Sequence, residues 1–147
     1  MNLQALAVCR ALVIEDDPDS CEALRQLLRR WGCEVECATS AGEALVRLDE
    51  WRPTCVLLDL MLPDAAGGVV LRKIRANHLP IRVAVITAAG ETSPVLKSAR
   101  SYAPDAVFHK PLNYGEIRKW LEEVSSGGFG EGGPSGGGAF YPFTAPI

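Results

Sequence analysis

The sequence carries little net charge and has no long hydrophobic stretch. Its 18 Asp and Glu residues against 15 Lys and Arg residues leave a net charge of −3, so nothing attracts the whole chain to nucleic acid or to an acidic membrane. No apolar run approaches the roughly 20 residues of a membrane-spanning helix, and residues 1–10 lack the charged start and long apolar core of a signal peptide. We therefore expect a cytoplasmic protein that does not enter membranes.

Patterns typical of structural metal sites and disulfides are also scarce. The five cysteines are Cys9, Cys21, Cys33, Cys37 and Cys55, and an odd number without a C-x-x-C pair does not indicate a disulfide framework. Cys33 and Cys37 lie four positions apart, but the two histidines, His78 and His109, do not have the spacing of a zinc finger. We interpret the cysteines as small, buried apolar side chains.

The remaining composition is that of one globular domain followed by a tail. The chain has 147 residues, 48% of them hydrophobic, and we expect residues 1–126 to form the folded domain. Residues 127–147 hold eight of the 14 glycines and a single charged residue, which predicts a flexible tail. Its end, residues 139–147, is apolar and aromatic, so both an inert tail and a short docking peptide remain open.

The chain is organised around an apolar run that ends in an acid. Four apolar residues, 55–58, lead directly into Asp59, and a run of this length predicts a strand buried on both faces. Residues 10–14 form a similar run, which leads into Glu15 and Asp16. Further strands are expected at residues 34–38, 81–87 and 105–109.

A helical pattern follows each of these strands. The first helix begins at Asp17, as the cap, and Pro18, and it ends at Gly32. The second begins with the capping box Ser40 to Glu43. The other helices are expected at about residues 69–75, 92–102 and 113–124. Strands alternating with helices predict an α/β fold: a five-stranded parallel sheet, doubly wound, in a flavodoxin-like three-layer sandwich.

Polar side chains stand at the ends of four of the predicted strands or directly after them. Glu15 and Asp16 follow the first, Asp59 follows the third, Thr87 ends the fourth, and Lys110 follows the fifth. Parallel strands bring these ends to one edge of the sheet, where three carboxylates would raise one another's pKa values. A divalent cation removes that repulsion, and oxygen ligands suit Mg²⁺. An ammonium and a hydroxyl group nearby suit phosphoryl oxygens. Taken singly, each residue has an ordinary structural explanation; taken together they predict one site.

This combination resembles the receiver domain of two-component response regulators. The matching residues are Glu15, Asp16, Asp59, Pro63, Gly67, Thr87, Ala88, Lys110 and Pro111. The resemblance covers about residues 8–125, which is essentially the whole predicted folded part.

The resemblance implies a metal site at the acidic residues. Asp16 would bind Mg²⁺ directly, with Glu15 acting mainly through water. Asp59 and the backbone carbonyl of Met61 would complete the protein ligands.

It also implies a role in phosphoryl transfer. Asp59 would accept a phosphoryl group from a histidine kinase or a histidine phosphotransfer protein, and Thr87 and Lys110 would contact that group. The Lys110–Pro111 peptide bond would be cis. Such a domain would catalyse only its own phosphorylation and would not otherwise be an enzyme. It would signal by contact with an output protein that the sequence does not identify.

The sequence departs from the family at two places. Val107 stands where an aromatic residue usually lies, three residues before the lysine, and Phe108 should face the other side of its strand, so we expect weaker coupling to the output surface. Met61 and Ala89 are apolar where polar side chains can place a hydrolytic water, so we expect a long-lived acyl phosphate.

Two other functions remain as alternatives. The first is a phosphorylation-independent binding module with the receiver fold. The second is a phosphatase similar to haloacid dehalogenases, which would require a second Asp where Met61 stands. We expect no DNA binding by this chain, because nothing after residue 125 could form a helix-turn-helix and the basic residues do not cluster into a nucleic-acid-binding footprint.

Overall fold

The computed structural model describes residues 9–65 and 67–125, in which strands and helices alternate as predicted. In chain order they are β1 (Arg10–Ile14), α2 (Pro18–Arg30), β2 (Glu34–Ala38), α3 (Ala41–Glu50), β3 (Cys55–Asp59), α4 (Gly68–Ala76), β4 (Arg82–Thr87), α5 (Pro94–Arg100), β5 (Ala106–His109) and α6 (Tyr114–Ser125). The predicted tail, residues 127–147, lies outside the described residues.

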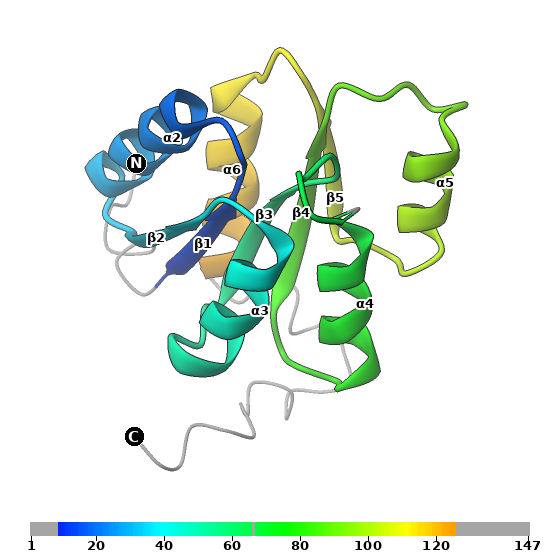
Figure 1. Cartoon of the computed structure of the whole chain (residues 1–147). Coiled ribbons are helices and arrows are strands. Elements are labelled where there is room, and N and C mark those ends of the chain that lie inside the picture. Colours follow the sequence, from blue (N-terminus) through cyan, green and yellow to red (C-terminus); the bar gives the residue numbers. More distant parts are fainter. Residues whose placement is uncertain (1–8, 66, 126–147) are drawn as a thin grey trace.

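The parallel strands form one sheet between two layers of helices, which confirms the predicted fold class (Figure 1). The strand order is β2-β1-β3-β4-β5. Helices α2 and α6 pack on one face, and α3, α4 and α5 pack on the other. Every residue of β3 is buried, so its apolar side chains contribute to both cores, as expected for a central strand covered on both faces.

The predicted caps explain where α2 begins and ends. The Asp17 side chain accepts a hydrogen bond from the Ser20 N–H at 3.2 Å, and Pro18 occupies the first turn. At the other end Gly32 has a φ of 102°, a conformation that glycine adopts without steric cost. The Gly32 N–H donates to the Arg29 carbonyl at 2.9 Å, which closes the last turn of the helix.

Helix α5 is shorter than the predicted range 92–102. It starts later because the Ser93 hydroxyl accepts from the Val95 N–H at 3.2 Å and so caps the helix. It ends earlier because the Arg75 guanidinium donates to the carbonyls of Tyr102 and Ala103 at 3.1 and 2.8 Å. These bonds hold the chain out of the helix, and Ala103 has a φ of 52°.

The strand register brings the predicted site residues together. Ile14 of β1 pairs with Leu58 of β3. Glu15 directly follows Ile14 and Asp59 directly follows Leu58, so these two acids lie at the same level of the sheet. β1 lies between β2 and β3, and the connections from β1 and β3 therefore run to opposite sides. In an open α/β sheet such a reversal leaves a crevice at the carboxyl edge, where ligands bind.

The connection after β3 passes very close to the strand end. The Gly67 N–H donates to the Leu60 carbonyl at 2.8 Å. A Cβ atom at Gly67 would lie 2.3 Å from the Asp59 carbonyl oxygen and 3.0 Å from the Leu60 Cα. Gly67 is therefore required by a close backbone approach, since its φ of −59° is open to any residue.

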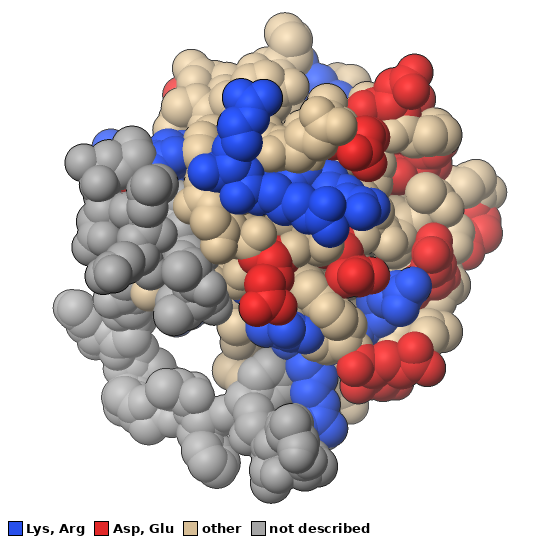
Figure 2. Space-filling model, turned by 90° about the vertical axis from the view of Figure 1, so that its left-hand side faces the viewer, with Lys and Arg blue, Asp and Glu red and all other residues tan. Residues whose placement is uncertain are grey.

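The surface carries charges of both signs. On the face turned to the viewer in Figure 2, several Lys and Arg side chains lie together and Asp and Glu side chains lie around them. Among the described residues, no helix combines the length and the hydropathy that crossing a membrane requires.

We predict that Gly67→Ala lowers the free energy of unfolding by about 1–3 kcal/mol, because the added methyl group forces the loop away from Asp59. Gly68→Ala is the matched control, since no atom of the described residues lies within 4 Å of a Cβ atom there, and it should be neutral or stabilise by up to about 1 kcal/mol. Urea unfolding of both variants measures the difference. Equal values would show that the close approach is not a constraint.

Candidate functional site

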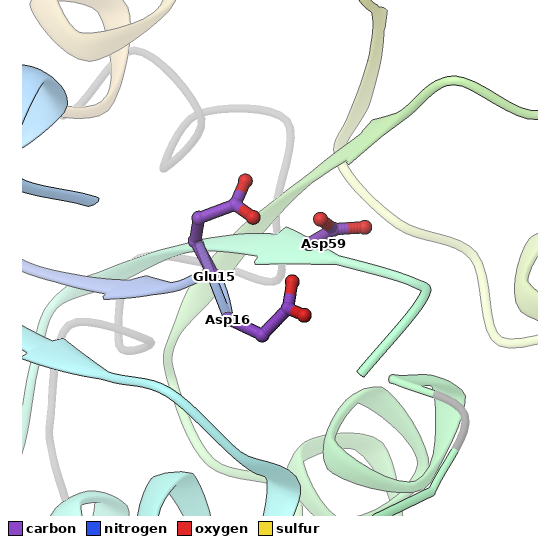
Figure 3. Close-up of side chains that lie close together, drawn as sticks. All are labelled: Glu15, Asp16 and Asp59. Carbon is purple, nitrogen blue, oxygen red and sulfur yellow. The ribbon is translucent and has the colours of Figure 1, made fainter. Parts of the chain in front are cut away.

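Three carboxylates converge at the ends of β1 and β3 (Figure 3). One oxygen from each of Glu15, Asp16 and Asp59 lies within 4.8 Å of the other two. Glu15 and Asp59 are buried, with 4% and 5% of their surface exposed, while Asp16 is exposed. The group is therefore open to solvent on the side of Asp16 and enclosed on the other.

Lys110 bridges the two buried carboxylates. Its Nζ donates to Glu15 Oε1 at 2.9 Å and to Asp59 Oδ2 at 3.0 Å. Lys110 reaches this position because it directly follows β5, where its own N–H donates to the Thr87 carbonyl at 2.8 Å. The next peptide bond, Lys110–Pro111, is cis, which confirms the prediction.

The pKa values reflect burial and this bridge. Burial raises the pKa of Glu15 above its usual value by more than the hydrogen bond from Lys110 lowers it, and the charge of Asp59 adds to the increase. Burial alone lowers the pKa of Lys110, but its bonds to Glu15 and Asp59 outweigh burial and raise it. Carboxylate repulsion was predicted for Glu15, but its burial has the larger effect.

Backbone contacts fix the Asp59 side chain and the loop after it. Asp59 Oδ1 accepts from the Met61 N–H at 2.9 Å. Further along, the Asp64 carboxylate accepts from the N–H groups of Ala41 and Gly42 at 2.8 and 2.9 Å, which lowers the pKa of Asp64. Asp64 thus ties the loop to the start of α3, a role that sequence reasoning missed because its partners lie more than 20 residues away.

Thr87 lies at the end of β4 and is fully buried. Its hydroxyl oxygen accepts from the Ala89 N–H at 2.9 Å, and this bond forms a tight turn after the strand. The hydroxyl is thereby directed toward its own loop, and the hydroxyl proton is a donor that this bond does not use.

The residues before Lys110 alternate between the two faces of the sheet. Val107 packs against the core under α3, α4 and α5, and Phe108 packs against the core under α2 and α6. The expected opposite orientation of Phe108 is confirmed. Tyr102, the other aromatic residue near β5, packs on the same core as Val107.

Comparison with known proteins identifies the family. Residues 11–122 match the response regulator receiver domain. The chain belongs to this family.

Its fold also agrees with solved receiver structures. A CheY-like receiver domain protein from Methanospirillum hungatei superimposes with a TM-score of 0.72 at 26% identity, over 80% of this chain and 97% of that one. A two-component response regulator from Clostridium difficile gives a TM-score of 0.72 at 23% identity, over 79% of this chain and 94% of that one, which supports the fold alone.

Curated relatives of this receiver domain are longer proteins. The transcriptional regulatory protein ZraR of Salmonella typhimurium is 30% identical over 113 residues, which are 77% of this chain and 25% of that protein. The DNA-binding response regulator MtrA of Mycolicibacterium smegmatis is 37% identical over 108 residues, 74% of this chain and 46% of that protein. The chain thus spans between a quarter and a half of the length of these relatives.

The acidic group of this receiver domain fits a divalent cation. Its three candidate ligands offer only carboxylate oxygens, the donor type that hard cations such as Mg²⁺ prefer. When all groups are ionised, the three carboxylates and the Lys110 ammonium leave two net negative charges, which one divalent cation balances. The exposed Asp16 leaves room for the water ligands that Mg²⁺ usually keeps.

We predict that Lys110→Met destabilises the receiver domain at neutral pH, because it leaves two buried carboxylates without a counter-charge. The loss should be about 1–3 kcal/mol, below that of a fully buried pair, since 32% of the Lys110 side chain is exposed. Without the ammonium the folded-state pKa of Glu15 rises further, so the loss should shrink as the pH falls and Glu15 takes up a proton.

Urea unfolding in metal-free buffer at several pH values measures this effect. Lys97→Met, which removes an exposed lysine of α5, serves as the control. Adding Glu15→Gln to Lys110→Met should restore part of the lost stability. A loss that is the same at every pH would contradict the electrostatic explanation.

Proposed function

We propose that this receiver domain takes a phosphoryl group from a histidine kinase or a histidine phosphotransfer protein onto Asp59, in a step that depends on Mg²⁺. The observation that carries the proposal is the placement of Asp59. Its carboxylate lies beside two other acids that can hold a cation, and it is hydrogen-bonded to Lys110. The proposed nucleophile, Asp59, therefore lies next to both the candidate cation site and the positive charge of Lys110. Phosphoryl transfer requires this arrangement.

Each residue has a proposed role in the transfer. An Asp59 oxygen attacks phosphorus in line, so a P–O bond forms while the P–N bond to the donor imidazole breaks and its electron pair stays on nitrogen. Asp16 and the Met61 carbonyl would hold Mg²⁺ directly, and Glu15 would hold it through water. The cation would supply positive charge opposite the phosphoryl oxygens. Lys110 moves its ammonium from Asp59 to a phosphoryl oxygen.

Thr87 completes the proposed site after transfer. Its hydroxyl donates a hydrogen bond to a phosphoryl oxygen through the proton that the Ala89 bond leaves unused. Because Ala89 is held by the same hydroxyl at 2.9 Å, turning Thr87 also shifts the loop before α5. The change at Asp59 therefore reaches the surface that carries α5.

The donor protein must bring its phosphohistidine to Asp59, and the surface beside Lys110 offers a place for it. A hollow of about 370 Å³ lies between α2 and the start of α6. Glu15 and Lys110 line its inner end, and Ala23, Leu112 and Tyr114 add apolar surface. We propose that the donor docks here, and that the output partner is a protein reached by contact.

A phosphorylation-independent binding module remains the second candidate. It is favoured by Val107, a half-buried aliphatic side chain in place of the usual aromatic residue of the switch. Failure of Asp59 to accept a phosphoryl group, in a chain that binds Mg²⁺, would support this candidate.

We predict that incubation with Mg²⁺ and acetyl phosphate adds one phosphoryl group to the chain, as measured by intact-mass spectrometry. The adduct should be absent without Mg²⁺ and absent in Asp59→Asn. Asp49→Asn, which changes an exposed acid of α3, should be phosphorylated like the parent chain. An adduct that persists in Asp59→Asn would contradict the assignment of the acceptor.

We also predict that the acyl phosphate is long-lived. Met61 is apolar and 58% exposed, and Ala89 carries no polar group, so neither side chain can position an attacking water. Met61→Asn should shorten the lifetime severalfold, as followed by intact mass after the phosphodonor is removed. Loss of the phosphoryl group from the parent chain within seconds, without a phosphatase, would refute this prediction.

A further inference from the structure

A second hollow lies beside the edge strand β5, outside the phosphoryl site. Its volume is about 300 Å³, and it is lined by Ala106, Phe108, Glu116, Lys119, Trp120 and Glu123. Phe108 and Trp120 meet edge to face, with ring centroids 6.3 Å apart. Its lining thus combines two aromatic rings with three charged residues of α6, Glu116, Lys119 and Glu123. We call this hollow the β5–α6 groove.

Trp120, which lines this groove, contains a buried hydrogen-bond donor. Its side chain is buried, with 5% of the residue exposed, and within the described part of the chain its Nε1–H has no hydrogen-bond partner. A buried indole N–H usually finds an acceptor. What the groove offers a peptide is the aromatic surface of Phe108 and Trp120, which an apolar side chain can cover.

The chain itself contains a segment with that chemistry. Residues 139–147 include Phe140, Tyr141 and Phe143 and have no charged side chain, so they suit the two aromatic rings of the groove and do not oppose lining residues with charges of both signs. Pro142 and Pro146 restrict the free segment, which lowers the entropy lost on docking.

The segment can reach the groove. It follows α6, one wall of the groove, and is joined to it by the 13 residues 126–138. A glycine-rich linker of this length spans about 20 Å on average, whereas Trp120 lies only about 8 Å from the end of α6 along the helix axis. Such a linker gives an effective concentration in the millimolar range, so the segment docks if its intrinsic dissociation constant is below about 1 mM.

We propose that residues 139–147 bind in the β5–α6 groove of their own chain. One aromatic ring of the segment packs on Phe108 and Trp120, the two aromatic residues that line the groove. Any protein that uses this groove must then displace the segment. The proposal does not depend on phosphorylation of Asp59.

NMR of the full ¹⁵N-labelled chain tests the proposal, because Trp31, Trp51 and Trp120 each give one indole N–H signal. Trp31→Phe and Trp51→Phe assign the Trp120 signal by elimination. The triple variant Phe140→Ala, Tyr141→Ala, Phe143→Ala should shift this signal and abolish nuclear Overhauser contacts between it and the aromatic rings of the segment. Phe129→Ala, which removes an aromatic ring from the linker, should leave both unchanged.

Dilution separates docking within one chain from docking between chains. Docking in cis leaves the Trp120 signal of the parent chain at the same position at all protein concentrations. A signal that moves on dilution would assign the contact to a second copy and overturn the proposal. An identical Trp120 signal in the parent chain and the triple variant would also overturn it. Neither the triple variant nor Phe129→Ala changes a residue of the folded domain, so a loss of folding does not confuse this comparison.

Discussion

The bridge from Lys110 to the carboxylates of Glu15 and Asp59 is the interaction on which the site depends. Two buried acids at neighbouring strand ends would repel each other without it. The parallel register of β1 and β3 fixes their backbone positions side by side. The Lys110 ammonium offsets this repulsion, because it donates hydrogen bonds to Glu15 at 2.9 Å and to Asp59 at 3.0 Å. With Asp16 included and all groups ionised, two net negative charges remain, and these favour the binding of a divalent cation.

The same bridge connects the charge state of the site with the backbone around it. Lys110 is held by β5 and by the Thr87 carbonyl, and Thr87 in turn holds the loop before α5. On the other side, Gly67 and Asp64 fix the loop that follows Asp59. A phosphoryl group on Asp59 would therefore act on two loops at once, through side chains that are already hydrogen-bonded to them.

Much of this arrangement could be predicted because it depends on local patterns. Apolar runs that end in acids place Asp16 and Asp59 at strand ends, and caps such as Asp17 and Gly32 fix the limits of α2. Other features depend on contacts between distant residues. The Lys110 bridge, the Arg75 bonds that end α5, and the Asp64 cap of α3 each join segments more than 20 residues apart, and no short pattern records them. The need for Gly67 was visible only as a family resemblance until the structure showed the backbone atoms that a side chain would meet.

The most direct test of the account is a calorimetric titration of the metal-free chain with Mg²⁺. If the three carboxylates and Lys110 form one site with two net negative charges, the parent chain binds one Mg²⁺. Asp16→Asn should weaken this binding by at least about tenfold, whereas Asp49→Asn should bind as the parent does. Equal binding by the parent chain and Asp16→Asn, or no binding by the parent, would show that the acidic group is not the cation site that the proposed phosphorylation of Asp59 requires.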